Sequence, residues 1–355
     1  MKVNIMKLIL VIAALGLMAA PALAGSVTIP NTFSASTVAK ASEVNGNFTA
    51  TKTAVDDNDS RITALETLVT DLIANVTTLK ASETDLIANV TSLKAKLAAV
   101  TDDGTDFTIT GRNVHIVSGS GTTDDGGSLT GKGNLIIGYN EDASNEAETR
   151  TGSHNLVIGR EHTYSSHSGL VAGYDNAIMN AAASVSGGSL NEASGDYSSV
   201  SGGANATASG WGSSVSGGFL GKSSGNYSSI SGGYYGEASG TYSSVSGGNS
   251  GIASGAGSSV SGGRENTASG NYSSVSGGYI SEASGENSSV SGGGGHTASG
   301  ITSSVSGGST NIASGNVSSV TGGYNNEAAG TYDTVIGGTG NTTDATAATN
   351  YEILP

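Results

Sequence analysis

A valine or isoleucine recurs every 15 residues through the second half of the chain, and no other feature limits the fold as strongly. The recurring residues are Val185, Val200, Val215, Ile230, Val245, Val260, Val275, Val290, Val305, Val320 and Val335. Each is followed, after one residue, by a Gly-Gly pair, and most are followed eight residues later by an alanine. The unit is SSVSGGxxNxASGxY, and a period this short is typical of stacked coils rather than of a globular domain.

The two apolar positions of the unit predict two short strands per coil, with one valine and one alanine pointing inward. The 56 glycines fit this arrangement, because glycine accepts the positive φ and the close backbone approach of tight turns. Stacked coils lie about 4.8 Å apart, so eleven of them make a rod about 50 Å long. We therefore expect a mainly β fold, a parallel β-roll or solenoid of 15-residue repeats over residues 184–338.

The inward side chains are too small to hold such a coil by themselves. Burying a valine contributes roughly 1.5–3 kcal/mol, whereas ordering fifteen residues costs on the order of 20 kcal/mol. Hydrogen bonds between coils must therefore contribute to stability. We also expect packing against other chains to contribute.

Residues 41–100 predict an α-helical coiled-coil stalk, because apolar residues recur there every seven positions. The first heptad series contains Val55, Ile62, Val69, Val76, Glu83, Val90 and Leu97, and the second contains Leu65, Leu72, Leu79, Leu86, Leu93 and Val100. A lone amphipathic helix would follow a 3.6-residue period and leave this register. β-Branched residues in the first series favour two strands, whereas Leu68, Ile73 and Ile87 widen the apolar seam and favour three or more. The heptads alone leave two chains and three chains both open.

The first residues have the features of an export signal. Lys2 and Lys7 accompany an apolar run, and Ala22-Leu23-Ala24 is a cleavage motif. We expect export to the extracellular space or the cell surface, and an exported protein of this kind is compatible with association with an outer membrane. We expect no transmembrane span in the mature chain. The expected divisions are a signal peptide at 1–24, a lead-in at 25–40, the stalk at 41–100, transition strands (FTIT, NVHIV, NLIIG, NLVIG) and degenerate coils at 101–183, the regular repeats at 184–338 and a polar tail at 339–355.

Composition and motifs argue against several kinds of chemistry. A formal charge of −15 without a basic cluster argues against nucleic acid and anionic membranes as partners. The glycine-rich segment 126–133 lacks the Ser or Thr that a P-loop requires, and the repeats lack the recurrent aspartate of calcium-binding β-rolls. We interpret His154, His162 and His167 as surface-loop histidines, since a metal site needs three or four converging ligands. We expect no catalytic residues, no cofactor, no metal and no enzyme activity.

The aromatic residues of the repeats are the candidate ligand surface. One set recurs twelve residues after the valine: Tyr197, Tyr227, Tyr242, Tyr272 and Tyr332. The other set lies in the variable pair after Gly-Gly: Phe219, Tyr234, Tyr235, Tyr279 and Tyr324. Aromatic rows with hydroxyls can stack on sugars or contact protein ligands. A structural ladder that covers the coil edge, or that seals a contact between chains, is the alternative for the Tyr row.

The repeat also resembles a known family. The SSVSGGxxNxASGxY units, NLVIG at 155–159 and SVSGG at 184–188 are similar to the YadA-like head repeats of trimeric autotransporter adhesins, which are also seen in tail-fibre-like proteins. The resemblance covers residues 134–338 and implies a left-handed parallel β-roll, three chains side by side and a role in surface attachment. The units here are one residue longer than the usual repeat of those heads, the stalk precedes the roll, and no C-terminal membrane anchor is expected.

These observations lead to two hypotheses of function. The first is a non-enzymatic, adhesin-like homotrimer that binds a host, matrix or glycan ligand through the β-roll. The second is a structural fibre or spacer of a surface layer or appendage, which the regular repeat fits equally well.

Overall fold

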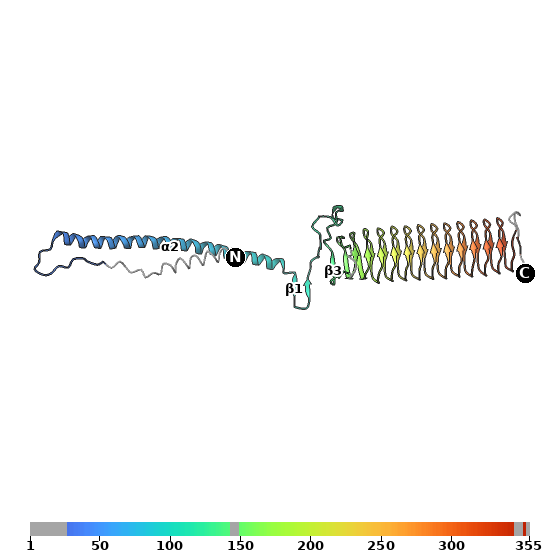
Figure 1. Cartoon of the computed structure of the whole chain (residues 1–355), viewed down its shortest axis with the longest axis horizontal. Helices are drawn as coiled ribbons and strands as arrows, with labels where there is room; N and C mark the ends of the chain where they lie inside the picture. Colours follow the sequence, from blue (N-terminus) through green and yellow to red (C-terminus); the bar gives the residue numbers. More distant parts are fainter. Residues whose placement is uncertain (1–26, 143–148, 344–350, 353–355) are drawn as a thin grey trace. The chain divides into compact units, whose positions relative to one another are not determined.

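The structure, a computed structural model, describes residues 27–142, 149–343 and 351–352. The chain divides into two compact units, Met1–Asn113 and Val114–Pro355, whose described residues are coloured blue to cyan and cyan to red in Figure 1. The signal peptide expected at residues 1–24 lies outside the described residues.

The first unit is built on one long helix, α2 (Ala41–Lys96, 56 residues). Glu43 lies in its first turn and Lys94 and Lys96 in its last, where each charge complements the helix dipole. The lead-in is tied to the helix by Asn31, whose backbone N–H donates to Asn47 Oδ1 at 2.9 Å while Asn47 Nδ2 donates to the Asn31 carbonyl at 2.8 Å.

No residue of α2 is buried. Its heptad side chains face solvent, with exposed fractions of 43% for Leu72 and 63% for Leu65. By length and composition α2 is also apolar enough to cross a membrane, although the sequence analysis expected no span there.

A two-stranded antiparallel hairpin follows α2. It consists of β1 (Val100–Asp102) and β2 (Phe107–Ile109). The side chain of Asp103 accepts hydrogen bonds from the backbone N–H groups of Thr105 and Asp106, at 2.8 and 2.7 Å, which forms the turn. Strand β2 confirms the FTIT prediction, whereas residues 113–117 form no strand. In that segment Val114 and Val117 are 62% and 68% exposed, so its apolar side chains find no core to pack on.

The second unit is a parallel β-solenoid whose regular coils each carry two short strands. Paired strands of the first sheet lie 14 residues apart from β4 to β8 and 15 residues apart from β8 to β28. Within the described residues, one sheet has 15 strands and the other 12. The first sheet comprises β3 (Leu135–Ile137), β4 (Leu156–Arg160), β6 (Leu170–Tyr174), β8 (Ser184–Val185), β10 (Ser199–Val200), β12 (Ser214–Val215), β14 (Ser229–Ile230), β16 (Ser244–Val245), β18 (Ser259–Val260), β20 (Ser274–Val275), β22 (Ser289–Val290), β24 (Ser304–Val305), β26 (Ser319–Val320), β28 (Thr334–Val335) and β29 (Tyr351–Glu352). The second comprises β5 (Thr163–Tyr164), β7 (Ala177–Ile178), β9 (Glu192–Ala193), β11 (Thr207–Ala208), β13 (Lys222–Ser223), β15 (Glu237–Ala238), β17 (Ile252–Ala253), β19 (Thr267–Ala268), β21 (Glu282–Ala283), β23 (Thr297–Ala298), β25 (Ile312–Ala313) and β27 (Glu327–Ala328).

The coil at residues 228–242 illustrates the arrangement. Strand β14 leads into a first turn at 231–236, strand β15 follows, and a second turn at 239–243 leads to the next coil. Ile230 and Ala238 point inward and are 1% and 0% exposed. Both strands of this coil pair in register with their equivalents 15 residues away, so the expected repeat, the two strands per coil and the inward Val and Ala are confirmed.

Glycine is required where neighbouring coils come closest. A Cβ on Gly240, in the second turn, would overlap the carbonyl group of Gly255 in the next coil. Gly233, in the first turn, combines a φ of +98° with the same close approach to Gly248. The second glycine of the Gly-Gly pair and the glycine of Ser-Gly therefore let the coils stack at sheet spacing.

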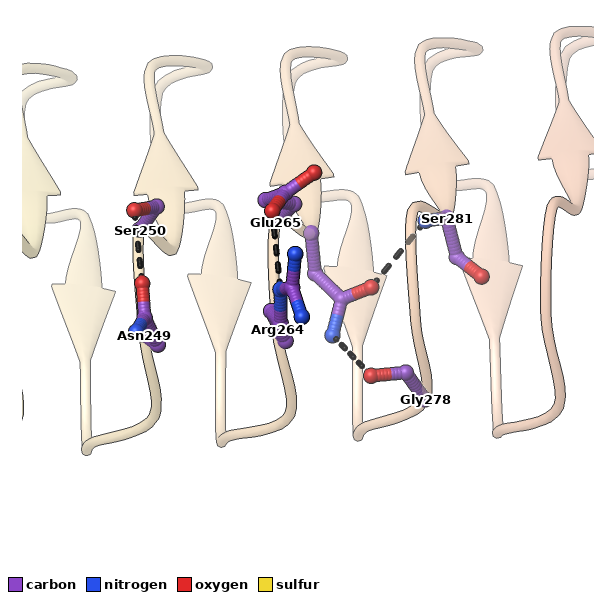
Figure 2. A network of polar contacts seen from close by, with 7 residues as sticks. Asn249, Ser250, Arg264, Glu265, Gly278 and Ser281 are labelled. Atoms are coloured by element: carbon purple, nitrogen blue, oxygen red, sulfur yellow. Dashed lines mark hydrogen bonds and ion pairs between the residues drawn. The ribbon is translucent and has the colours of Figure 1, made fainter.

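The interior contains a further column that the sequence analysis did not place, so its expectation of one Val and one Ala per coil is incomplete. Asn266 Nδ2 donates to the carbonyls of Gly262 and Gly278, at 2.8 and 3.1 Å, and Asn266 Oδ1 accepts from the N–H of Ser281 at 3.0 Å. Figure 2 shows the Gly278 and Ser281 ends of these bonds. Members of this asparagine column are Asn176, Asn191, Asn266, Asn311, Asn326 and Asn341.

Two of the histidines belong to the same column. His162 and His296 are 0% and 1% exposed, and each accepts on Nδ1 from the backbone N–H of the next column member while Nε2 lies near a backbone carbonyl. The interpretation of His162 as a surface-loop residue was therefore wrong. Its imidazole replaces an asparagine amide inside the coil.

The ends of the stack differ from the regular coils. Before β3, Asp125 accepts hydrogen bonds from Ser118, Ser120, Thr130 and Ser153, which ties the 3-10 turn η1 (Asp125–Gly127) to the first coils. These bonds, led by the Ser118 hydroxyl, hold the pKa of the Asp125 carboxyl well below its usual range. At the other end the stack continues past residue 338, because Thr339 and Thr342 bridge to the preceding coil.

Candidate interaction surface

The candidate aromatic residues lie on two different turns of the coils. Tyr227 and Tyr242 belong to the second turn, and Tyr234 and Tyr235 belong to the first. The chain reverses at each turn, so the two sets lie at opposite ends of the strands. They form two separate rows along the solenoid rather than one patch.

The second-turn row contains four rings in succession over neighbouring coils. The ring centroids of Tyr197 and Trp211 are 5.3 Å apart, those of Trp211 and Tyr227 are 4.8 Å apart, and Tyr227 stacks on Tyr242 at 5.1 Å. The rings remain 42% to 65% exposed. The rings of this segment therefore contact one another along the coil edge and remain partly exposed.

The backbone under the tyrosines has an unusual conformation. Tyr227, Tyr242 and Tyr272 have φ values of 58°, 60° and 56°, in the left-handed region that costs a non-glycine residue roughly 1–2 kcal/mol. Glycine fills the same position at Gly212 and Gly257, so the coil can close without an aromatic residue. Asn287, Thr302 and Val317 take the same conformation at this position, so the turn imposes it on every residue that stands there.

The first-turn row carries a compact cluster of three rings. Phe219 stacks on Tyr234 at 5.3 Å, and Tyr235 meets Tyr234 edge-on at 4.4 Å. The three are 37% to 48% exposed. A hydrogen bond from Tyr234 to Tyr235 raises the pKa of the Tyr234 phenol above its usual value.

Further along this row the aromatic rings meet cations instead. The guanidinium of Arg264 lies 5.1 Å from the ring centroid of Tyr279, and Arg160 lies 4.8 Å from that of Tyr174. Arg264 also pairs with Glu265 at 2.8 Å (Figure 2). The tyrosine rings of this row therefore contact both aromatic and cationic side chains of neighbouring coils.

A shallow groove lies at the start of the first-turn row. It has a volume of about 340 Å³ and is lined by Gly138, Tyr139, Glu141, Gly159, Arg160, Gly173 and Tyr174. A hydrogen bond to Glu161 raises the pKa of the Tyr174 phenol. The groove brings a cation and two phenols together, but no nucleophile with a general base.

The described residues contain no group of three or more His, Asp, Glu or Cys side chains placed to hold a metal ion. The three histidines singled out in the sequence do not converge. His154 Nδ1 contacts the Thr123 carbonyl at 2.8 Å, His162 is part of the asparagine column, and His167 contacts Ser168.

Sequence reasoning missed one member of the surface, Trp211. Trp211 is the chain's only tryptophan and lies one position before the Tyr row, in a coil where Gly212 takes the tyrosine's place. Because that coil has no tyrosine at the repeat position, the repeat pattern did not indicate that the coil contributes an aromatic ring. A search one residue to either side of the row would have found it.

The fold and the surface together define a parallel β-solenoid with exposed aromatic rows on two turns. No protein-family model and no curated protein matches the chain.

Proposed function

We propose that the protein is an exported, non-enzymatic, adhesin-like binding protein that contacts a glycan or a surface protein through the aromatic rows of its solenoid. The observation that carries the proposal is the four-ring ladder Tyr197–Trp211–Tyr227–Tyr242, which stays exposed on a backbone that would close with glycine. Large, rigid rings with polar tips are the side chains that dominate recognition surfaces.

We further propose that three parallel chains associate through α2 and the solenoid, and that the solenoid is left-handed. Support for association comes from the heptad residues of α2, which are exposed in the single chain although burying such apolar area stabilises by about 25 cal/mol per Å². The number three and the handedness come from the resemblance to YadA-like heads.

Binding assays on the exported chain test the ligand-binding proposal. The chain from residue 25 onward is applied to glycan arrays, matrix proteins and cells, alongside a Tyr227→Ser/Tyr242→Ser variant. Ile301→Ser/Ile336→Ser is the matched control, because it removes two exposed apolar residues outside the aromatic clusters. Binding that the tyrosine variant loses and the control keeps supports the proposal, whereas no binding to any of these surfaces contradicts it.

The second candidate is a structural fibre or spacer. It is favoured by the continuous ladder of coil-to-coil hydrogen bonds, which makes a rod regardless of surface residues. Electron micrographs of the source cells that lack filaments or protruding rods would contradict this candidate.

A further inference from the structure

Every third coil of the solenoid carries the same outward residues. Glu192, Glu237, Glu282 and Glu327 lie 45 residues apart, at the first position of the second strand. Three of these coils also carry a tyrosine three residues earlier: Tyr234, Tyr279 and Tyr324. The coils between them vary at both positions, so the solenoid repeats its surface in modules of three coils.

A second residue follows the same 45-residue period, and hydrogen bonds within the chain account for it. Asn226, Asn271 and Asn316 lie in the second turn of every third coil. Each side-chain Oδ1 accepts from a backbone N–H of the preceding coil, at 3.1, 3.1 and 3.2 Å. These asparagines stabilise the turns and require no external partner.

The glutamates have no such internal role. Among the described residues, Glu237 and Glu282 make no side-chain hydrogen bond or ion pair, and Glu327 accepts only from the Ser314 hydroxyl. Glu237 has Lys222 as one ladder neighbour but makes no ion pair with it, and the neighbours of Glu282 and Glu327 include the uncharged Thr267 and Ile312. A carboxylate kept at the same outward position in all four modules points to a group outside the chain.

The chain itself indicates the chemistry of that group. Arg264 lies over the ring of Tyr279, one of the period-three tyrosines, at 5.1 Å. Residues 184–338 contain two basic residues, Lys222 and Arg264, against eight acidic ones, a net charge of −6. Aromatic faces and carboxylates both attract cations, and Tyr324, which is 56% exposed, has Ser309 rather than an arginine as its ladder neighbour.

We propose that Tyr234–Glu237, Tyr279–Glu282 and Tyr324–Glu327 form a line of regularly spaced subsites that bind arginine or lysine side chains of an extended segment of a partner protein. The subsites repeat every three coils, about 14 Å at the spacing of paired strands. In an extended peptide with a basic residue at every fourth position, successive basic side chains lie on the same face and are separated by about the same distance. This inference rests on the proposed binding function and names the partner's chemistry.

The test uses the exported chain and a synthetic 12-residue peptide with arginine at every fourth position, measured by calorimetry at physiological salt. The comparison peptide has the same composition with its three arginines contiguous. We expect the spaced peptide to bind about tenfold more tightly. Equal affinities would overturn the proposal, because non-specific attraction to an acidic protein does not depend on spacing.

Two charge-matched double variants test the residues. Glu282→Gln/Glu327→Gln should lower the affinity for the spaced peptide about tenfold, whereas Asp196→Asn/Glu286→Gln, which removes the same charge elsewhere, should leave it within about twofold. Tyr324→Phe should retain binding and Tyr324→Leu should weaken it, since only the ring is needed. Equal losses in the two double variants would overturn the proposal.

Deletion of residues 288–302 tests the spacing. The deletion removes one whole coil and leaves Glu282 and Glu327 two coils apart, about 10 Å at the spacing of paired strands, which no longer matches arginines at every fourth position. The spaced peptide should therefore bind the deletion variant more weakly than the full chain, and an unchanged affinity would contradict the line of subsites. If the chain binds the spaced peptide more tightly but binds no cells, matrix or glycans, the adhesin proposal fails and the subsites are supported. If the chain binds such surfaces but does not distinguish the two peptides, the subsites fail and the adhesin proposal is supported.

Discussion

Nδ1 of His296 accepts a hydrogen bond from the backbone N–H of Asn311 at 3.1 Å. One coil later, Oδ1 of Asn311 accepts the equivalent hydrogen bond from the backbone N–H of Asn326. His296 Nε2 lies 3.1 Å from the Gly308 carbonyl. Because a backbone N–H can only donate and a carbonyl can only accept, this arrangement requires the neutral imidazole with its proton on Nε2. A protonated ring would turn a second N–H toward that of Asn311.

His296 should therefore make the solenoid less stable in weak acid. Burial lowers the pKa of His296 below its ordinary value of 6.5, so the unfolded chain takes up the proton first as pH falls. The contribution to stability is complete above the unfolded pKa and is lost as pH falls from there toward the folded pKa. Thermal unfolding followed by circular dichroism between about pH 7.5 and pH 5 should show this decline.

The variant His296→Asn supplies the matched comparison. It restores the asparagine of the column and should reduce the loss of stability in acid, whereas His115→Asn, which replaces an exposed histidine outside the coils, should leave the decline unchanged. An identical pH dependence in all three proteins would contradict the role assigned to His296.

The asparagine column should contribute strongly to each coil that contains it. Asn311 Nδ2 donates to Gly307 and Gly323, and its Oδ1 accepts from Asn326. We expect Asn311→Ala to cost about 1–3 kcal/mol in local unfolding free energy, measured by hydrogen exchange in the coil at 303–317. Asn311→His should cost less, because His296 occupies the same column.

The aspartate variant of the same residue separates hydrogen bonding from shape. Asn311→Asp keeps the size of the side chain but removes both N–H donors and buries a carboxylate, so it should destabilise the coil more than alanine does at neutral pH. A stability equal to that of the native chain would show that the amide donors are not needed.

Replacement by alanine should destabilise the coil much more at Gly315 than at Gly307. A Cβ on Gly315 would overlap the backbone carbonyl of Gly330, whereas a Cβ on Gly307 would meet nothing within 4 Å. Gly315→Ala should therefore open the stack at that point and cost several kcal/mol, about as much as a severe core substitution, while Gly307→Ala should change stability by about 1 kcal/mol or less. Chemical unfolding with hydrogen exchange distinguishes the two, and similar effects would contradict the close stacking.

Trp211 offers a direct readout of ligand binding to the second-turn row. It is the chain's only tryptophan, is 42% exposed and lies between Tyr197 and Tyr227. A ligand that covers this row should shift Trp211 emission to shorter wavelength, and Tyr227→Ser should weaken the response. A ligand that binds only the first-turn row should leave the emission unchanged.

Glu83 should weaken the association proposed for α2. It occupies a heptad position that Val76 and Val90 occupy in the neighbouring heptads, and burying a carboxylate in an apolar seam is unfavourable. Glu83→Val should raise the melting temperature of the associated helix, while Asp85→Val, which removes the same charge from the outward face, should raise it less. Light scattering of the exported chain, beside a version lacking residues 41–100, gives the number of chains, and a folded monomer in both would contradict the association.

The 15-residue repeat is enough to predict the coil. An apolar residue every 15 positions, with Ile230 and the equivalent valines in one half of the unit and alanines such as Ala238 in the other, can be buried only if each coil repeats its neighbour. The close approach of Gly240 to Gly255 then follows from the need to bring strands to hydrogen-bonding distance. The heptads of residues 41–96 determined a long helix for the same reason, since their period matches one face of a helix.

Contacts between coils determine which polar residues are buried and which aromatic rings contact one another. Asn266 is buried because Gly262 and Gly278, four residues before it and twelve after it, present their carbonyls to its amide, and a sequence does not display those partners. His162 and His296 fill the same column only because imidazole nitrogens can reach similar groups. Trp211 joins the aromatic row because stacking brings its ring centroid to 4.8 Å from that of Tyr227, although the two residues occupy different positions of the repeat. Contacts between coils, rather than the repeat itself, determine these placements.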